Sequence, residues 1–315
     1  MKKPLIILTG PTAVGKTSAS IKLAKKIDGE IISADSMQVY KGMDVGTAKI
    51  TPQEMDGIPH YLVDEIAPDT PFHVYEFKKM AESYMEQIYA KGKIPVIVGG
   101  TGFYIQALLY DIDFCEEEND RTYRNELEKL AAEKGAKYLH DMLEEVDHVS
   151  AVNIHPNNVK RVIRALEYHH ETGKLISAHN SEQRAKESPY HFLYAVLTME
   201  RKKLYERIDQ RVDLMVKEGL FQEMEELLRK GYTKELTSMQ AIGYKELFSY
   251  FEGNASYEDT IAEIKKDTRH FAKRQLTWFR REKEVVFINK DEFPGEDALV
   301  DEILRLALDK DILNQ

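Results

Sequence analysis

The stretch that most constrains this chain is residues 10–17, Gly-Pro-Thr-Ala-Val-Gly-Lys-Thr. It fits the pattern G-x-x-x-x-G-K-[ST], follows an apolar run at 5–8 and precedes a segment that predicts a helix over 18–27. In such a loop the backbone N–H groups point inward, and the helix N-terminus and the lysine ammonium add positive charge. The pattern therefore predicts a cradle for a di- or triphosphate, made by Gly10, Pro11, Thr12, Ala13, Val14, Gly15, Lys16 and Thr17. The Thr17 hydroxyl is placed to ligate Mg²⁺.

Composition narrows the class of protein. The chain has 315 residues, a formal net charge of −10 and a single cysteine, Cys115. One cysteine excludes an intramolecular disulfide and a multi-cysteine zinc site, and none of the ten histidines has metal-ligand spacing. No run of about 18 apolar residues occurs. We therefore expect a cytoplasmic protein that does not enter a membrane.

Strand-like and helix-like segments alternate along most of the chain. Strands are expected at 30–35, 58–64, 94–98, 191–197 and 284–288, and helices at 72–91, 103–110, 201–230 (broken near Gly219) and 296–308. This alternation predicts an α/β fold with a doubly wound parallel sheet. Asp35 ends the second strand, so it should lie beside the phosphate loop, because sites in such sheets form at the carboxyl ends of strands.

The alternation stops between about residues 114 and 189, where only helices are expected, at 121–145 and 156–172. This predicts a helical insertion domain at 114–189 within a catalytic core made of 1–113 and 190–315. Residues 158–186 of the insertion hold six Lys/Arg and three Asp/Glu, which gives it a basic arm.

A second basic stretch, residues 265–283, holds eight Lys/Arg and two Asp/Glu. In an acidic protein it is a candidate surface for a nucleic-acid backbone. The alternative is a solvated face on a packed helix. Trp278 within this stretch is expected in the core rather than as a stacking platform for a base.

Three kinds of phosphate-loop protein compete: a GTPase-like switch, a kinase of a small nucleotide or metabolite, and a transferase with diphosphate as leaving group. A switch needs a D-x-x-G turn, which the sequence lacks, and residues 289–292 only approach N-K-x-D. The strand at 94–98 ends in Gly-Gly-Thr-Gly (99–102) without an acidic residue, so a usual kinase anchor for Mg²⁺ is missing. Asp35 could replace that anchor, so the kinase remains the alternative.

Six segments together resemble the successive signatures of the bacterial tRNA dimethylallyltransferases, also called tRNA isopentenyltransferases. They are residues 10–17, 33–49, 98–104, 155–167, 241–247 and 273–278. The resemblance implies a P-loop NTPase-like core with a helical insertion. It also implies transfer of a dimethylallyl group from dimethylallyl diphosphate to N6 of adenine 37, in tRNAs reading codons that begin with U. Mg²⁺ as cofactor and a monomer without an obligate protein partner are implied as well.

The resemblance further implies roles for particular residues. Asp35 is the general base, and Lys16, Thr101 and Arg211 contact or stabilise the diphosphate, with the backbone donors from Thr12 to Thr17. For Arg211 the alternative is a salt bridge to Asp213 or to another neighbour on its helix. The implied tRNA contacts are Asp35, Ser36, Met37, Gln38, Thr101, Arg124, Lys160, Arg161, Val162, Ile163 and Arg164; the segment 35–38 reads a flipped adenine. For Arg124 the alternative is a solvated helix charge.

Overall fold

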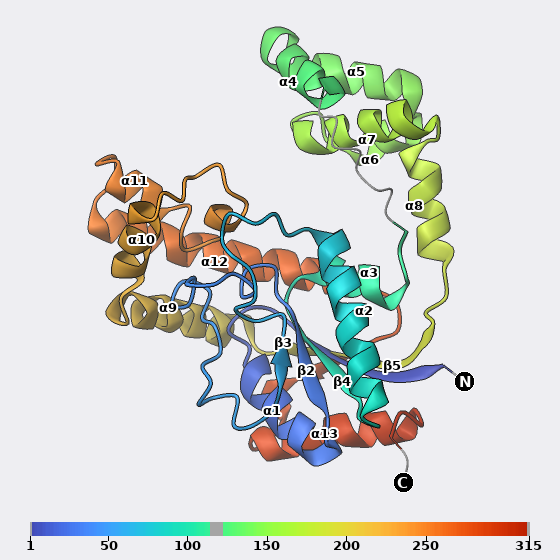
Figure 1. Ribbon diagram of the computed structural model, residues 1–315, viewed down its shortest axis with the longest axis vertical. Helices are drawn as coiled ribbons and strands as arrows, with labels where there is room; N and C mark the ends of the chain where they lie inside the picture. Colours follow the sequence, from blue (N-terminus) through green and yellow to red (C-terminus); the bar gives the residue numbers. More distant parts are fainter. Residues whose placement is uncertain (1, 114–121, 314–315) are drawn as a thin grey trace. The chain divides into compact units, whose positions relative to one another are not determined.

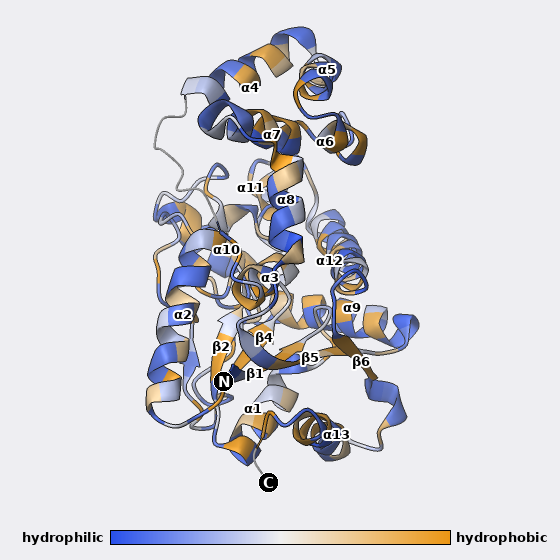
Figure 2. Ribbon diagram, turned by 90° about the vertical axis from the view of Figure 1, so that its right-hand side faces the viewer, coloured by the Kyte–Doolittle hydropathy of each residue, from blue (hydrophilic) through white to orange (hydrophobic). Residues whose placement is uncertain are grey.

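Buried aliphatic strands form a single sheet in the computed structural model, which describes residues 2–113 and 122–313. The sheet has six strands, all paired in parallel, in the order β3-β2-β4-β1-β5-β6. The strands are β1 (Lys3–Thr9), β2 (Glu30–Ala34), β3 (His60–Tyr61), β4 (Pro95–Gly99), β5 (Tyr190–Thr198) and β6 (Val285–Asn289). The central strand β1 contains the apolar run of residues 5–8, all of which are buried. Figure 2 shows the sheet in hydrophobic colours. The predicted doubly wound parallel sheet is confirmed.

Helices cover both faces of this sheet. On one face, α1 (Lys16–Ile27) packs against α13 (Glu296–Asp309), and both lie below the sheet in Figure 1. On the other face lie α2 (Val74–Ala90) and α3 (Gly102–Leu109), whereas α12 (Tyr257–Phe279) runs across the carboxyl ends of the strands, above them in Figure 1. The chain leaves β1 in one direction along the sheet and returns in the other, so right-handed crossovers place α1 and α2 on opposite faces.

The segment between β5 and α12 carries three more helices and a short 3-10 turn at Ser238–Gln240. The helices are α9 (Arg201–Lys217), α10 (Leu220–Arg229) and α11 (Leu247–Phe251). The break expected near Gly219 is present, because Gly219 adopts φ 103° between α9 and α10. The long helix α12 packs along α9.

One strand is much shorter than expected. The sequence predicts a strand over 58–64, but β3 holds only His60 and Tyr61. Leu62 and Asp64 adopt φ 60° and 58°, which leaves the extended conformation, and the Leu62 N–H donates to the Glu65 carboxylate instead of to a strand.

The chain divides into two compact units, Met1–Leu109 with Pro189–Gln315 and Tyr110–Ser188. In the described part of the second unit all regular elements are helices: α4 (Thr122–Lys134), α5 (Ala136–Val146), α6 (His148–Asn153), α7 (Val159–Thr172) and α8 (Ile176–Ala185). Their core includes Leu127, Leu139, Leu143, Val162 and Leu166. Cys115 and the other residues of 114–121 lie outside the described residues.

The helix boundaries in this unit differ from those expected. The single helix predicted at 121–145 is two helices, because Gly135 adopts φ 86° and starts a new helix. The helix predicted at 156–172 begins at Val159, after the Pro156 turn. Helices α6 and α8 were not predicted, since their short or mixed sequences show weak periodicity.

Over residues 2–113 and 122–313, no helix combines the length and the apolar character that crossing a bilayer requires.

Candidate active site

The phosphate loop, residues 10–17, joins β1 to α1. Its two glycines have backbone conformations or close neighbours that a residue with a Cβ would not tolerate. Gly10 and Gly15 adopt φ 147° and 97°. A Cβ on Gly10 would lie 2.5 Å from the Leu197 carbonyl oxygen of the neighbouring strand β5. Inside the loop the Lys16 ammonium donates to the Gly10 and Pro11 carbonyl oxygens, both at 3.0 Å. The loop thus encloses a cation next to the helix N-terminus, as an anion site requires.

Electrostatics link Lys16 to two more of the expected residues. Burial, together with the Arg211 charge, lowers the pKa of Lys16 to about 8, although the Asp35 carboxylate acts to raise it. Burial and Arg207 lower the pKa of Arg211, and Asp35 raises this pKa too. Lys16, Arg211 and Asp35 therefore share one site, in which two cations face one carboxylate.

Asp35 follows β2, and Thr101 follows the adjacent strand β4. Paired ends of these strands bring the two residues together, since Ala34 lies opposite Gly99. The Thr101 N–H donates to the Ala34 carbonyl at 3.1 Å, and the Thr101 hydroxyl accepts from the Ser36 N–H at 3.2 Å. The Asp35 Oδ1 accepts from the N–H groups of Met37 and Gln38, at 2.9 and 3.3 Å, which fixes the carboxylate at the start of a turn.

Arg211 on α9 faces the phosphate loop. Its Nη1 lies 3.5 Å from the Thr12 hydroxyl. The alternative salt bridge to Asp213 is not formed, because Asp213 pairs with Lys265 at 2.6 Å. One turn earlier, the Arg207 Nε donates to the Ala13 carbonyl at 2.9 Å. Sequence reasoning missed Arg207, although its i, i+4 spacing to Arg211 places both on one face of the helix.

Gln275 on α12 is a second residue that the sequence did not reveal. This buried amide accepts from the Thr12 N–H at 2.8 Å and donates to the Gly100 carbonyl at 2.9 Å. It thus links the phosphate loop to the Gly-Gly-Thr-Gly turn that carries Thr101. The expectation that every N–H from Thr12 onward faces the diphosphate is wrong for Thr12, whose N–H is donated to Gln275.

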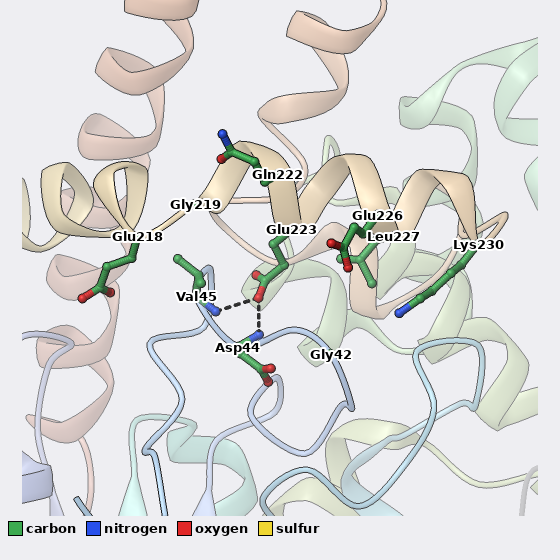
Figure 3. Close-up of a pocket in the computed structure, with 10 residues that line it drawn as sticks. All are labelled: Gly42, Asp44, Val45, Glu218, Gly219, Gln222, Glu223, Glu226, Leu227 and Lys230. Atoms are coloured by element: carbon green, nitrogen blue, oxygen red, sulfur yellow. Dashed lines mark hydrogen bonds between the residues drawn. The ribbon is translucent and has the colours of Figure 1, made fainter. Parts of the chain in front are cut away.

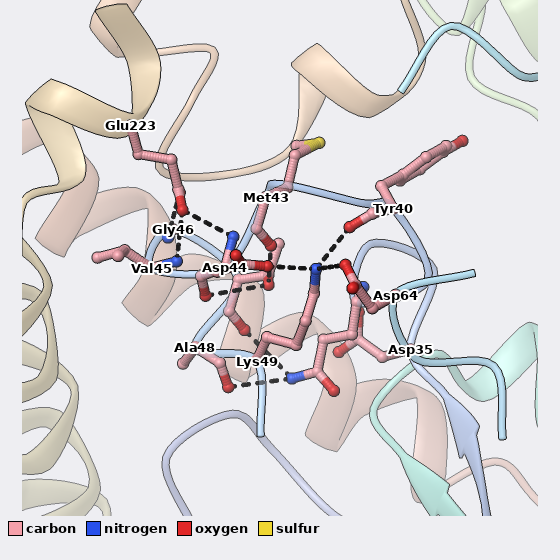
Figure 4. A network of polar contacts seen from close by, with 12 residues as sticks. Asp35, Tyr40, Met43, Asp44, Val45, Gly46, Ala48, Lys49, Asp64 and Glu223 are labelled. Carbon is pink, nitrogen blue, oxygen red and sulfur yellow. Dashed lines mark hydrogen bonds and ion pairs between the residues drawn. The ribbon is translucent and has the colours of Figure 1, made fainter. Parts of the chain in front are cut away.

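The loop of residues 36–49 is tied down by its own polar groups (Figure 4). The buried Lys49 ammonium binds the Tyr40 carbonyl at 2.6 Å and the Asp44 and Asp64 carboxylates at 2.5 and 2.8 Å. The Gln38 amide donates to the Thr47 and Ala48 carbonyls, both at 3.2 Å. Gln38 therefore keeps its carbonyl oxygen, an acceptor, for a ligand.

Glu223 on α10 holds the far end of this loop. Its carboxylate accepts from the backbone N–H groups of Asp44, Val45 and Gly46 at 2.8–3.0 Å and from the Tyr244 hydroxyl at 2.5 Å. A cavity of about 420 Å³ lies beside this contact (Figure 3). Its charged side chains are Asp44, Glu218, Glu223, Glu226 and Lys230. Because acidic groups dominate its lining, this cavity disfavours a phosphate anion.

Thr17 lies exposed on the first turn of α1, directly after Lys16. A hydroxyl oxygen at the phosphate cradle is a ligand that Mg²⁺ accepts, so this residue fits the expected metal. Elsewhere in the described ranges, His140, Asp141 and Glu144 bring one possible ligand atom each within 4.8 Å of one another. Asp141 is paired with Lys137, however, and His140 Nε2 hydrogen-bonds to the Ala151 and Ile154 carbonyls.

The expected tRNA patch on α7 contains both surface and core residues. Lys160 and Arg161 are exposed and Arg164 is half-buried. Val162 and Ile163 are buried in the core of the helical unit, so their side chains do not reach a ligand, which corrects the expectation for these two. Arg124 forms a bidentate ion pair with Glu167, with distances of 2.7 and 2.8 Å. The alternative expectation of a solvated helix charge is therefore not met.

The basic stretch on α12 divides into two parts. Its first cations pair with carboxylates: Lys265 with Asp213, Lys266 with Glu263 and Arg269 with Asp209. Lys273 and Arg274 further along are exposed. Trp278 packs against Phe103 and over Gly102, where a Cβ would lie 2.2 Å from the indole. Trp278 is half-buried rather than fully in the core, and its partner Phe103 is exposed, so the expectation of a core position is met only in part.

A parallel sheet with a phosphate loop, a neighbouring carboxylate and arginines from a later helix defines a phosphate-binding α/β enzyme of the P-loop class. The family model described as IPP transferase matches residues 38–282. The chain belongs to this family. The motifs of its sequence already resembled those of the family.

The names of proteins with similar sequences and structures are consistent with this family assignment. A protein of Lachnoclostridium phytofermentans named tRNA dimethylallyltransferase is 56% identical over 99% of both chains. The tRNA isopentenylpyrophosphate transferase of Bacillus halodurans has a similar structure, with a TM-score of 0.74, 44% identity and coverage of 98% of this chain and 97% of that one. A eukaryotic dimethylallyltransferase, solved acting on tRNA, has a TM-score of 0.84 at 30% identity, with coverage of 98% and 79%.

Proposed function

We propose that the protein transfers the dimethylallyl group of dimethylallyl diphosphate to N6 of adenine 37 in tRNAs that read codons beginning with U. The observation that carries this proposal is the placement of Asp35 at a strand end beside the phosphate loop, where its charge acts on Lys16 and Arg211. In this proposal a base and a leaving-group site act side by side at the carboxyl edge of the sheet.

The reaction forms a bond from N6 of the adenine to C1 of the dimethylallyl group and breaks the bond from C1 to the diphosphate oxygen. The N6 proton moves to the Asp35 carboxylate, since the adenine amine is a poor nucleophile until it loses that proton. Negative charge develops on the departing diphosphate. In this proposal the Lys16 ammonium, the Arg211 guanidinium and backbone N–H groups of the phosphate loop stabilise this charge. Mg²⁺ held by the Thr17 hydroxyl would add positive charge there.

The adenine is read by the turn that follows β2. Because the Gln38 amide hydrogens are used within the loop, its carbonyl oxygen offers an acceptor to the base. The Asp35 Oδ1 is held by the turn, which keeps the carboxylate oriented towards the base. The base must leave its stack in the anticodon loop to reach these groups.

The tRNA backbone is bound by cations of both units in this proposal. Lys160, Arg161 and Arg164 supply charge from α7, and Lys273 and Arg274 supply it from α12. We also propose that the protein is cytoplasmic and requires no protein partner. We further propose that it is a monomer, and light scattering of the purified chain tests this oligomeric state.

Incubation with radiolabelled dimethylallyl diphosphate and unmodified tRNA tests the function. We expect label in tRNA, located at adenine 37 by nuclease digestion. The alternative kinase predicts label transfer only from ATP to a small acceptor, and that result would reject the prenyltransferase.

A further inference from the structure

Lys290 is a cation at the phosphate loop to which no role has been given. It follows the last residue of β6 directly, in a single 3-10 turn at Lys290–Glu292. Strand β6 pairs with β5, which pairs with β1, so its carboxyl end lies at the same edge of the sheet as the phosphate loop. Asp35 reaches this loop from the opposite direction along the sheet, from β2.

The Lys290 ammonium lies directly against the backbone of the loop. A Cβ built on Gly15 would lie 2.5 Å from the Lys290 Nζ and 3.7 Å from an Arg207 guanidinium nitrogen. Gly15 is the residue that precedes α1, and it adopts φ 97°. Lys290 therefore brings a positive charge to the end of α1 that is already positive.

Four cations gather around this short loop: Lys16, Arg207, Arg211 and Lys290. The carboxylate partner of Lys290 is Glu296, at a loose 3.6 Å. Glu296 is shared, because it also accepts from the Ser18 hydroxyl at 2.5 Å and lies 3.9 Å from Lys22. Like charges gathered at a helix N-terminus repel one another, and a multiply charged anion bound between them offsets this repulsion.

We propose that Lys290 binds the diphosphate of the donor, on the side of the phosphate loop opposite Asp35. This inference rests on the proposed function, because it takes the anion to be the donor's diphosphate. Lys290 holds the leaving group from the β6 side while Asp35 and Thr101 hold the acceptor from the β2 and β4 side. Glu296 keeps the ammonium at this place and also ties it to α13.

Calorimetric titration with inorganic pyrophosphate tests the proposal without any prenyl transfer. Lys290→Gln is expected to raise the Kd for pyrophosphate about tenfold, as expected for the loss of a charged hydrogen bond. Lys290→Arg should retain most of the affinity. The matched control is Lys22→Gln, which removes a cation from the same neighbourhood of Glu296 but on the exposed side of α1. It should change the Kd less than twofold.

A purely structural role predicts a different pattern. If Lys290 only anchors α13, then Lys290→Gln and Glu296→Gln lower the melting temperature alike and leave the Kd unchanged. A Kd of Lys290→Gln within twofold of the wild type, or an equal loss in Lys22→Gln, would overturn the proposal. Failure of the wild type to prenylate tRNA would instead refute the proposed function, while the pyrophosphate titration still reports on Lys290.

Discussion

At the scale of single residues, the site is a balance of charges around Lys16. Its ammonium donates hydrogen bonds to two loop carbonyls. Burial and the charge of the nearby Arg211 both lower its pKa. Asp35 is the carboxylate that opposes this effect. A phosphate anion in the loop would act in the same direction as Asp35 and more strongly.

The lowered pKa of Lys16, about 8, predicts a pH dependence of anion binding. Above pH 8 an increasing fraction of the free protein lacks this proton, and a bound anion restores it by raising the pKa. Pyrophosphate binding should therefore take up a proton above pH 8 and weaken as the pH rises. Calorimetry in buffers of different ionisation enthalpy measures the uptake, and Lys16→Met should abolish it. Equal proton uptake at pH 6.5 and pH 9 would contradict the assignment.

Asp35→Asn separates the base from the rest of the site. The amide oxygen can still accept from the Met37 N–H, so the turn is retained, but the proton acceptor is lost. We expect turnover to fall roughly 100- to 10,000-fold. Pyrophosphate affinity should stay the same or increase, since a negative charge near Lys16 and Arg211 is removed. Weakened pyrophosphate binding with normal turnover would refute the role of Asp35 as base.

At the scale of elements, α12 completes a site that begins at β1. Gln275 joins two loops through a single buried amide, and residues on α9 and after β6 reach the same place. The amide satisfies a donor on one loop and an acceptor on the other, so its removal leaves both without a partner.

Gln275→Met tests this link. It keeps the volume of the side chain but removes both hydrogen bonds, and we expect the free energy of unfolding to fall by about 2 kcal/mol. The KM for the donor should rise as well, because the phosphate loop loses its support at Thr12. Urea denaturation measures the first effect and steady-state kinetics the second. The exposed Gln222→Met is the control, and an equal loss in both variants would contradict the link.

Local patterns were enough to predict most elements but not the contacts between them. The break at Gly219 was predicted because the helical periodicity of apolar residues is strong on both sides of it. The break at Gly135 was missed because this glycine lies within a continuous run of charged, helix-like sequence. The motif at residues 10–17 and the strand that ends before Asp35 were enough to locate the site, because these two features lie close together in the sequence. Gln275 lies 263 positions from Thr12, and no local signal connects them. Val162 and Ile163 were assigned to a surface by their motif, although their apolar side chains indicated the core.

At the scale of the whole molecule, the helical unit carries a cationic edge on an otherwise acidic protein. The exposed Lys160 and Arg161 lie at the start of α7, and the apolar residues that follow them are its core. A net charge of −10 opposes RNA binding in general, so binding must depend on such local patches.

The double variant Lys160→Ala with Arg161→Ala should weaken tRNA binding and reduce its salt dependence. With roughly 0.7 per phosphate contact for single strands, the slope of log K against log salt should shrink by about 1.4. Filter binding at several salt concentrations measures it. Lys129→Ala with Lys137→Ala, two exposed cations elsewhere in the same unit, is the control. An unchanged slope in the first variant would exclude this patch, and pyrophosphate affinity should be unaffected in both.

The support of Thr12 by Gln275 also bears on how the protein is made. The glycine-rich turn leaves the ribosome early, but the amide that braces it is synthesised more than two hundred and fifty residues later. A nascent or prematurely terminated chain therefore lacks an assembled donor pocket, even though its hallmark motif is complete. We therefore expect catalytic competence only once translation has passed Gln275.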